Sequence, residues 1–122
     1  MLHPVYQQSL PPTTSSPAIV GSWARSVAEA EQPTLAERIH KTAQTLVHHV
    51  IRDISPHRRL HAELELTDTG LRLTVRVPGH AAHVGSLECF EMSGELTSFG
   101  CSGSPAGREA WAELRIETAA VA

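Results

Sequence analysis

Several residue types are scarce in this chain of 122 residues, and each scarcity excludes a class of protein. Two cysteines are too few for a disulfide framework. No run of apolar residues approaches the roughly 18 that a membrane-spanning helix needs. The first residues lack a basic stretch followed by an apolar one, so they do not predict a secretory signal. We therefore expect a cytoplasmic location.

Asparagine is absent, and Lys41 is the only lysine beside nine arginines. The codons of both residue types are AT-rich, so the composition indicates a GC-rich bacterial genome or one of its phages. The formal net charge is -3, which implies neither a strongly acidic nor a strongly basic partner. A hydrophobic content of 41% and a charged content of 19% are typical of a globular domain.

Residues 1–21 predict a flexible tail, because the segment is polar, contains four prolines and offers little apolar surface to bury. An alternative interpretation is a short partner-binding segment that uses Tyr6, Ile19 and Val20. Residues 22–122 are expected to form a single domain.

Two helices are expected after this tail. Residues 22–31 predict a short helix that Pro33 ends. A longer helix is expected from Thr34 to Ile54, because Thr34 and Glu37 have the spacing of a capping box. Its apolar residues recur at intervals of three and four and share one face. The basic and histidine side chains of this helix lie on the other face.

A β-hairpin is expected next, since apolar and polar residues alternate over 60–67 and 71–77. A loop over 67–70, with Gly70 in the left-handed conformation, sets one register. In that register the opposed pairs are Leu66–Leu71, Leu64–Leu73 and Glu65–Arg72. The charged pair is favourable on an exposed face.

Three further strands complete the expected fold. Residues 87–92 and 96–101 predict a second hairpin. Strict alternation favours a strand over a helix for the last segment, near 108–117. The sequence therefore predicts an α+β fold: one short and one long N-terminal helix, then an antiparallel five-strand meander with the long helix packed on one sheet face.

Sequence patterns predict no catalytic set and no cofactor. The glycines match no nucleotide-binding fingerprint. His80 and His83 are three residues apart and are the best metal ligands of the chain, with zinc as the alternative cofactor. A second alternative is a small-molecule-binding or enzymatic domain with an apolar pocket under the helix, near Glu91.

A nucleic-acid role is another alternative. Residues 34–61 contain five basic and two acidic side chains, which leaves +3, together with five histidines. Nucleic-acid binders usually have a stronger basic excess with interleaved aromatic residues, so this reading is disfavoured.

Trp111 is the most informative candidate, because the strand pattern places it on the polar face of the sheet with Glu113 and Arg115. A large aromatic side chain in that position is typical of an interface anchor. We therefore expect a small non-enzymatic protein-interaction module with a regulatory, accessory or inhibitory role. A domain of this size buries only a modest fraction of its surface when it folds alone. Pairing two such domains would bury more of it, which favours a homodimer.

Overall fold

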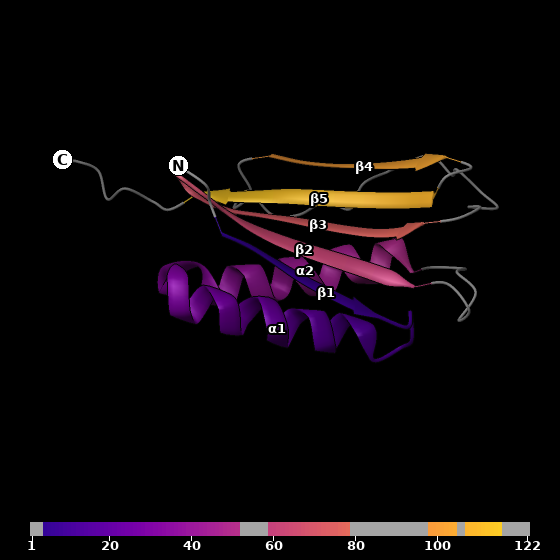
Figure 1. The fold of residues 1–122 in the computed structure, drawn as a ribbon, viewed down its shortest axis with the longest axis horizontal. Helices are drawn as coiled ribbons and strands as arrows, with labels where there is room; N and C mark the ends of the chain where they lie inside the picture. Colours follow the sequence, from indigo (N-terminus) through magenta and orange to yellow (C-terminus); the bar gives the residue numbers. More distant parts are fainter. Residues whose placement is uncertain (1–3, 52–58, 79–97, 105–106, 116–122) are drawn as a thin grey trace.

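Two helices cover one face of a five-stranded antiparallel sheet (Figure 1). The computed structural model describes residues 4–51, 59–78, 98–104 and 107–115. The helices are α1 (Ser16–Glu31) and α2 (Ala36–Val50), joined through a 3₁₀ turn, η1 (Pro33–Leu35). The strands are β1 (Val5–Leu10), β2 (Leu60–Thr67), β3 (Gly70–Pro78), β4 (Ser98–Ser104) and β5 (Gly107–Arg115). The α+β class with two helices and an antiparallel sheet is thus confirmed.

The order of strands differs from the expected meander. The sheet order is β1-β2-β3-β5-β4, so β5 lies between β3 and β4 instead of at the end. Four strands follow the helices in the described part of the chain, not five. The expected strand over 87–92 lies outside the described residues. The last segment is a strand, β5, as its alternation predicted.

The fifth strand of the sheet comes from the segment expected to be a flexible tail. Val5–Leu10 pairs antiparallel with β2, and α1 already begins at Ser16. Two features explain the difference. Pro17 lies in the first turn of α1, where its missing amide hydrogen costs no hydrogen bond. The buried Ser16 hydroxyl donates to the Pro11 carbonyl (2.8 Å) and accepts from the Thr13 amide (2.7 Å), which stabilises the turn before the helix.

The second helix starts differently from the expected capping box. Its N-cap is Leu35, and no side chain caps it. Thr34 lies within η1, because the chain first makes a 3₁₀ turn at Pro33. Glu37 contacts Arg25 of α1 instead, at 2.6 Å between Oε1 and Nη2. The expected apolar face is present, and its buried residues in α2 include Ile39, Ala43, Leu46, Val47 and Val50.

Small residues bring the two helices together. Gly21, Ala24 and Ala28 lie on the buried face of α1. A Cβ atom on Gly21 would lie 2.9 Å from Cγ of Gln44 and 3.2 Å from the carbonyl oxygen of His40, both in α2. The helix axes can therefore approach closely only because this position has no side chain.

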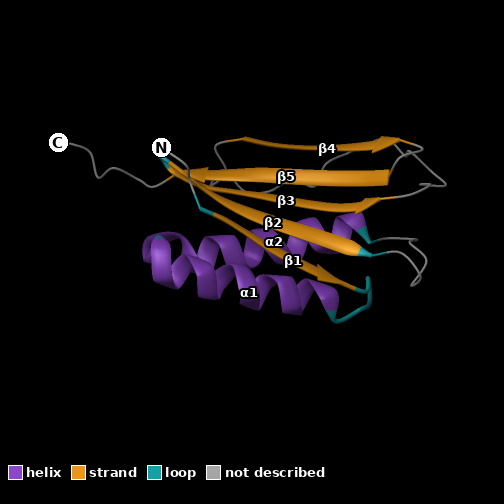
Figure 2. Cartoon of the chain, in the orientation of Figure 1, coloured by secondary structure: helices purple, strands orange, loops and turns teal. Residues whose placement is uncertain are grey.

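The helices divide the sheet between them. α2 lies against β3 and β5, whereas α1 lies against β1 and β2. Figure 2 shows both helices on the same side of the strands. The core between these layers is aliphatic, and its largest fully buried side chains are Leu35, Ile39, Leu46, Leu60, Leu64, Leu71, Leu73 and Leu114. No helix in the described ranges is long and apolar enough to cross a membrane.

The β2–β3 hairpin has the expected register, with Leu66 opposite Leu71, Leu64 opposite Leu73 and Glu65 opposite Arg72. The role expected for Gly70 is corrected. Its backbone is outside the left-handed region, and a Cβ atom there would lie 1.9 Å from the carbonyl oxygen of Leu114. Glycine is needed at this position because β5 approaches it closely.

Candidate functional site

The face of the sheet opposite the helices, called the open face below, carries three rows of side chains across the strands. Alternation along β2, β3 and β5 places every second residue there. From β1 to β5, the rows run through Val5–Glu65–Arg72–Glu113, Gln7–Glu63–Thr74–Trp111 and Ser9–His61–Arg76–Glu109. The four glutamates and two arginines of these rows give a surface with both charges and an acidic excess of two.

Trp111 is held in the middle of this face. The guanidinium carbon of Arg72 lies 4.8 Å from the centre of its ring, within the range of a cation–π interaction. Arg72 Nη1 lies 3.5 Å from Glu113 Oε1. Across the strands, Trp111 has Thr74 on one side and Gly100 on the other. Thr74 has a short side chain, and the half-buried indole is accessible from the open face.

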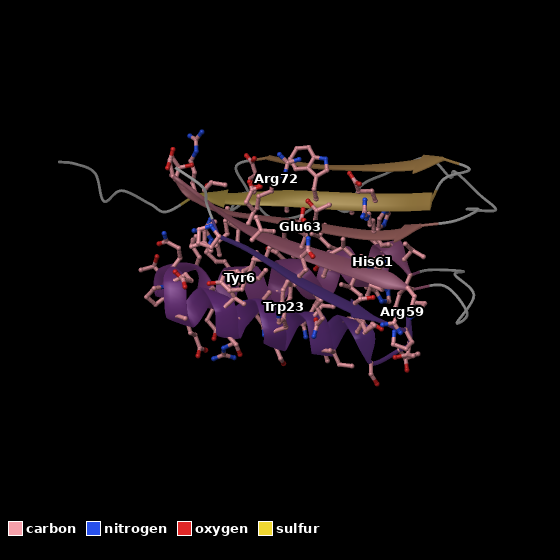
Figure 3. All side chains as sticks on the ribbon, viewed as in Figure 1. Tyr6, Trp23, Arg59, His61, Glu63 and Arg72 are labelled. Atoms are coloured by element: carbon pink, nitrogen blue, oxygen red, sulfur yellow. The ribbon has the colours of Figure 1, made fainter. Side chains whose placement is uncertain are left out.

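A hollow of about 570 Å³ lies beside this cluster. It is lined by Gln7, Gln8, Ser9, His61, Ala62, Glu63, Glu65, Arg72, Thr74, Arg76 and Glu109. Figure 3 shows Arg72, Glu63 and His61 spaced along this part of the sheet. The lining is polar and contains both charges, which is unlike the apolar pocket of a typical small-molecule site.

Two hydrogen bonds fix the β1 side of the hollow. Gln7 Nε2 donates to Glu63 Oε1 at 3.0 Å. Arg59 Nε donates to Ser9 Oγ at 3.2 Å. The first bond joins β1 to β2, and the second joins β1 to the residue that precedes β2. The edge strand β1 therefore forms one wall of the hollow.

The structure describes some of the candidate site residues that the sequence indicated, and others lie outside the described residues. Trp111 and Glu113 lie together on the open face, whereas exposed Arg115 lies at the end of β5, opposite Gly70. His80 and His83 lie outside the described residues, as does Glu91. Among the residues that the structure describes, no group of three or more His, Cys, Asp or Glu side chains could hold a metal ion.

The apolar-pocket and basic-helix alternatives gain no geometric support. The space between sheet and helices is occupied by buried aliphatic side chains, and the hollow is on the opposite face. On α2, Lys41 and His48 are exposed, but Arg38, His40 and His49 are partly buried. The basic residues therefore do not form one exposed stripe along α2.

Sequence reasoning missed Arg72 as a functional residue. The hairpin register placed it opposite Glu65 on the polar face, but its contact with Trp111 depends on β5 lying beside β3. The pairing of β5 with β3 would have been needed to predict this cluster, and alternation alone carries no such signal.

Tyr6 is the only tyrosine of the chain, which makes its titration a direct test of the β1–α1 contact. Its hydroxyl donates to Glu31 Oε1 at 2.9 Å. That hydrogen bond, with smaller effects of desolvation and of the carboxylate charge, raises the pKa of Tyr6. The neutral phenol is favoured, so this contact stabilises the fold below the unfolded pKa of about 10 and is lost as pH rises further.

We therefore expect the phenolate absorbance to appear at a higher pH than in the unfolded chain. The variant Glu31→Ala, which removes the acceptor, should lower the midpoint towards 10, whereas the control Glu29→Ala, whose carboxylate pairs with Arg25, should not. An unchanged midpoint in Glu31→Ala would mean that β1 does not lie against the end of α1 in solution.

No protein-family model matches this chain, and no curated protein matches it at a significant level.

Proposed function

We propose that this chain is a small, non-enzymatic protein-interaction module that works in the cytoplasm as a homodimer. Its role would be regulatory, accessory or inhibitory, through binding of a partner protein on the open face. The observation that carries the proposal is the cluster of Trp111, Arg72 and Glu113 in the middle of that face.

The cluster has the properties of an interface anchor. An indole that stays half-exposed keeps apolar area available for a partner, and Trp and Arg are the residue types most enriched among the dominant contacts of interfaces. Arg72 is positioned by both the ring and Glu113, so less side-chain freedom is lost on binding. The exposed ion pair itself contributes little to folding stability, at most about 1 kcal/mol.

The charges around the anchor favour a protein partner. Glu63, Glu65 and Glu109 line the hollow beside Arg72 and Arg76. The carboxylates would repel a phosphate backbone, while a protein surface with both charges could pair with each of them. The mixed surface therefore supports binding of a protein over binding of a nucleic acid.

A photo-crosslinking amino acid at position 74, beside the anchor, would test the proposal. It would be introduced into the full chain in cells of the source organism, with position 22 on the exposed side of α1 as the control site. The captured protein would then be purified and titrated calorimetrically. We expect Trp111→Ala to weaken its binding at least tenfold and Ser22→Ala to leave it unchanged.

Equal affinity of the purified partner for the wild type and for Trp111→Ala would contradict the proposed anchor. Crosslinks from position 22 alone would place the binding surface on the helices instead. Turnover of a small molecule by the purified chain would contradict the non-enzymatic role.

A further inference from the structure

The outer edge of β1 is unprotected in a way that edge strands usually are not. Natural edge strands carry charged residues, prolines or bulges that prevent pairing with another chain. The six residues of β1, Val-Tyr-Gln-Gln-Ser-Leu, include no charge, no proline and no glycine. No described segment pairs with this edge, because β1 is the first strand in the sheet order.

The hydrogen-bond pattern shows which groups are available there. The Leu66 amide donates to the Pro4 carbonyl at 3.1 Å. Backbone groups of alternate residues in a strand point to opposite sides, so the even-numbered residues of β1 bond to β2. The N–H and C=O groups of Val5, Gln7 and Ser9 therefore point outwards.

Exposed apolar side chains lie along the same border. Among the described residues, the large hydrophobic side chains that remain exposed are Val5 (46%) and Ile19 (45%). Ile19 lies one turn from Trp23, which packs only partly against the core, and Val27 continues this line. On α1 these residues lie on the side opposite Gly21, which faces α2. Figure 3 shows Trp23 and Tyr6 at the border of α1 and β1.

We propose that two copies of this chain assemble through β1, which pairs antiparallel with β1 of the second copy to form one continuous ten-stranded sheet. This inference rests on the proposed homodimer and specifies its interface. A two-fold axis at Gln7 places Gln7 opposite its own copy and Val5 opposite Ser9. These are the outward-pointing residues, so they form three pairs with two backbone hydrogen bonds each.

The helices fit the same arrangement. Paired strands are about 4.8 Å apart, and α1 lies under β1 and β2. The two-fold axis therefore brings the two α1 helices to about the 8–10 Å at which helices pack. The line of Ile19, Trp23 and Val27 then faces the same line of the second copy, and the exposed apolar area is buried. The open faces remain free on one side of the joined sheet.

Gln7→Pro tests the interface without removing a backbone hydrogen bond of the monomer, although it deletes the side-chain hydrogen bond from Gln7 Nε2 to Glu63. The substitution deletes an outward amide hydrogen, and proline is tolerated on an edge strand in this position. Gln7→Lys is the second variant, because it places two lysines at the axis while each can still pair with Glu63 of its own chain. Thr69→Lys, in the exposed β2–β3 turn, is the charge control. Sedimentation velocity would report mass, and far-UV circular dichroism would report folding.

We expect the wild type and Thr69→Lys to sediment at twice the monomer mass. Both Gln7 variants should stay folded and raise the dimer dissociation constant at least tenfold. In NMR hydrogen exchange on the dimer, the amides of Val5, Gln7 and Ser9 should be protected, and they should exchange rapidly in the Gln7→Lys monomer. The amides of Tyr6, Gln8 and Leu10 should be protected in both.

Two results would overturn the inference in different ways. A wild type that remains monomeric at all protein concentrations tested would contradict the homodimer itself. A dimer that both folded Gln7 variants leave intact would retain the homodimer but exclude β1 as its interface.

Discussion

Replacing Leu73 by alanine is expected to lower the free energy of unfolding by about 2–5 kcal/mol. Leu73 is fully buried in the central strand β3. It lies between Leu64 of β2 and Ala112 of β5, on the face that the helices cover. Truncation removes its transfer free energy and leaves a cavity that the neighbouring strands cannot close, since both are fixed by hydrogen bonds to β3.

Thr74→Ala is the matched control, because the next residue of the same strand points to the open face. Thr74→Ala should lower the free energy of unfolding by less than about 1 kcal/mol, since the Thr74 side chain is partly exposed in the hollow. Urea unfolding of both variants measures the difference. Equal losses at the two positions would mean that the helices do not cover this face of the sheet.

The parts of the fold that could be predicted are those fixed by local patterns. The β2–β3 register followed from alternation and loop length, because any shift by one residue would place apolar against polar side chains. β5 was predicted as a strand for the same reason. The apolar face of α2 followed from its helical spacing, although its first turn did not, because the proline at position 33 starts a 3₁₀ turn.

β1 could not be predicted, because its stability comes from a partner 50 to 60 residues away in the sequence. The segment alternates only weakly, since the polar Gln8 lies on the same side as Tyr6 and Leu10. The surrounding prolines then favoured a tail. In the structure, Pro11 and Pro12 lie in the connection from β1 to α1, and Pro17 lies in the first turn of the helix, so these prolines do not prevent order.

The position of β5 in the sheet is a second feature that the sequence pattern could not predict. Consecutive strands are usually neighbours, which favoured a meander. In the structure β3 pairs with β5, so β4 is not the neighbour of β3 but lies on the other side of β5. A strand pattern states which face is buried, but it does not state which strand lies alongside. Trp111 could therefore be placed on the polar face, whereas Arg72 could not be placed on its ring.

Gly70, the first residue of β3, gives a prediction in which the sign of the change in unfolding free energy is informative. A Cβ atom at Gly70 would lie 1.9 Å from the Leu114 carbonyl oxygen and 3.0 Å from Cα of Arg115. These are backbone atoms of the paired strand, so no side-chain rotation can relieve the contact. Gly70→Ala must therefore separate the ends of β3 and β5, at an expected loss of about 3 kcal/mol in the free energy of unfolding.

The same substitution would be stabilising if β5 were elsewhere. Outside the left-handed region, alanine in place of glycine usually stabilises by about 0.4–1 kcal/mol, because it restricts the unfolded chain. Thr69→Ala, in the adjacent exposed turn, is the control and should change stability little. Urea unfolding gives the sign, and backbone NMR shifts at Leu114 and Arg115 locate the disturbance. A more stable Gly70→Ala protein with unchanged shifts would contradict the pairing of β3 with β5 at this end, and with it the contact between Arg72 and Trp111.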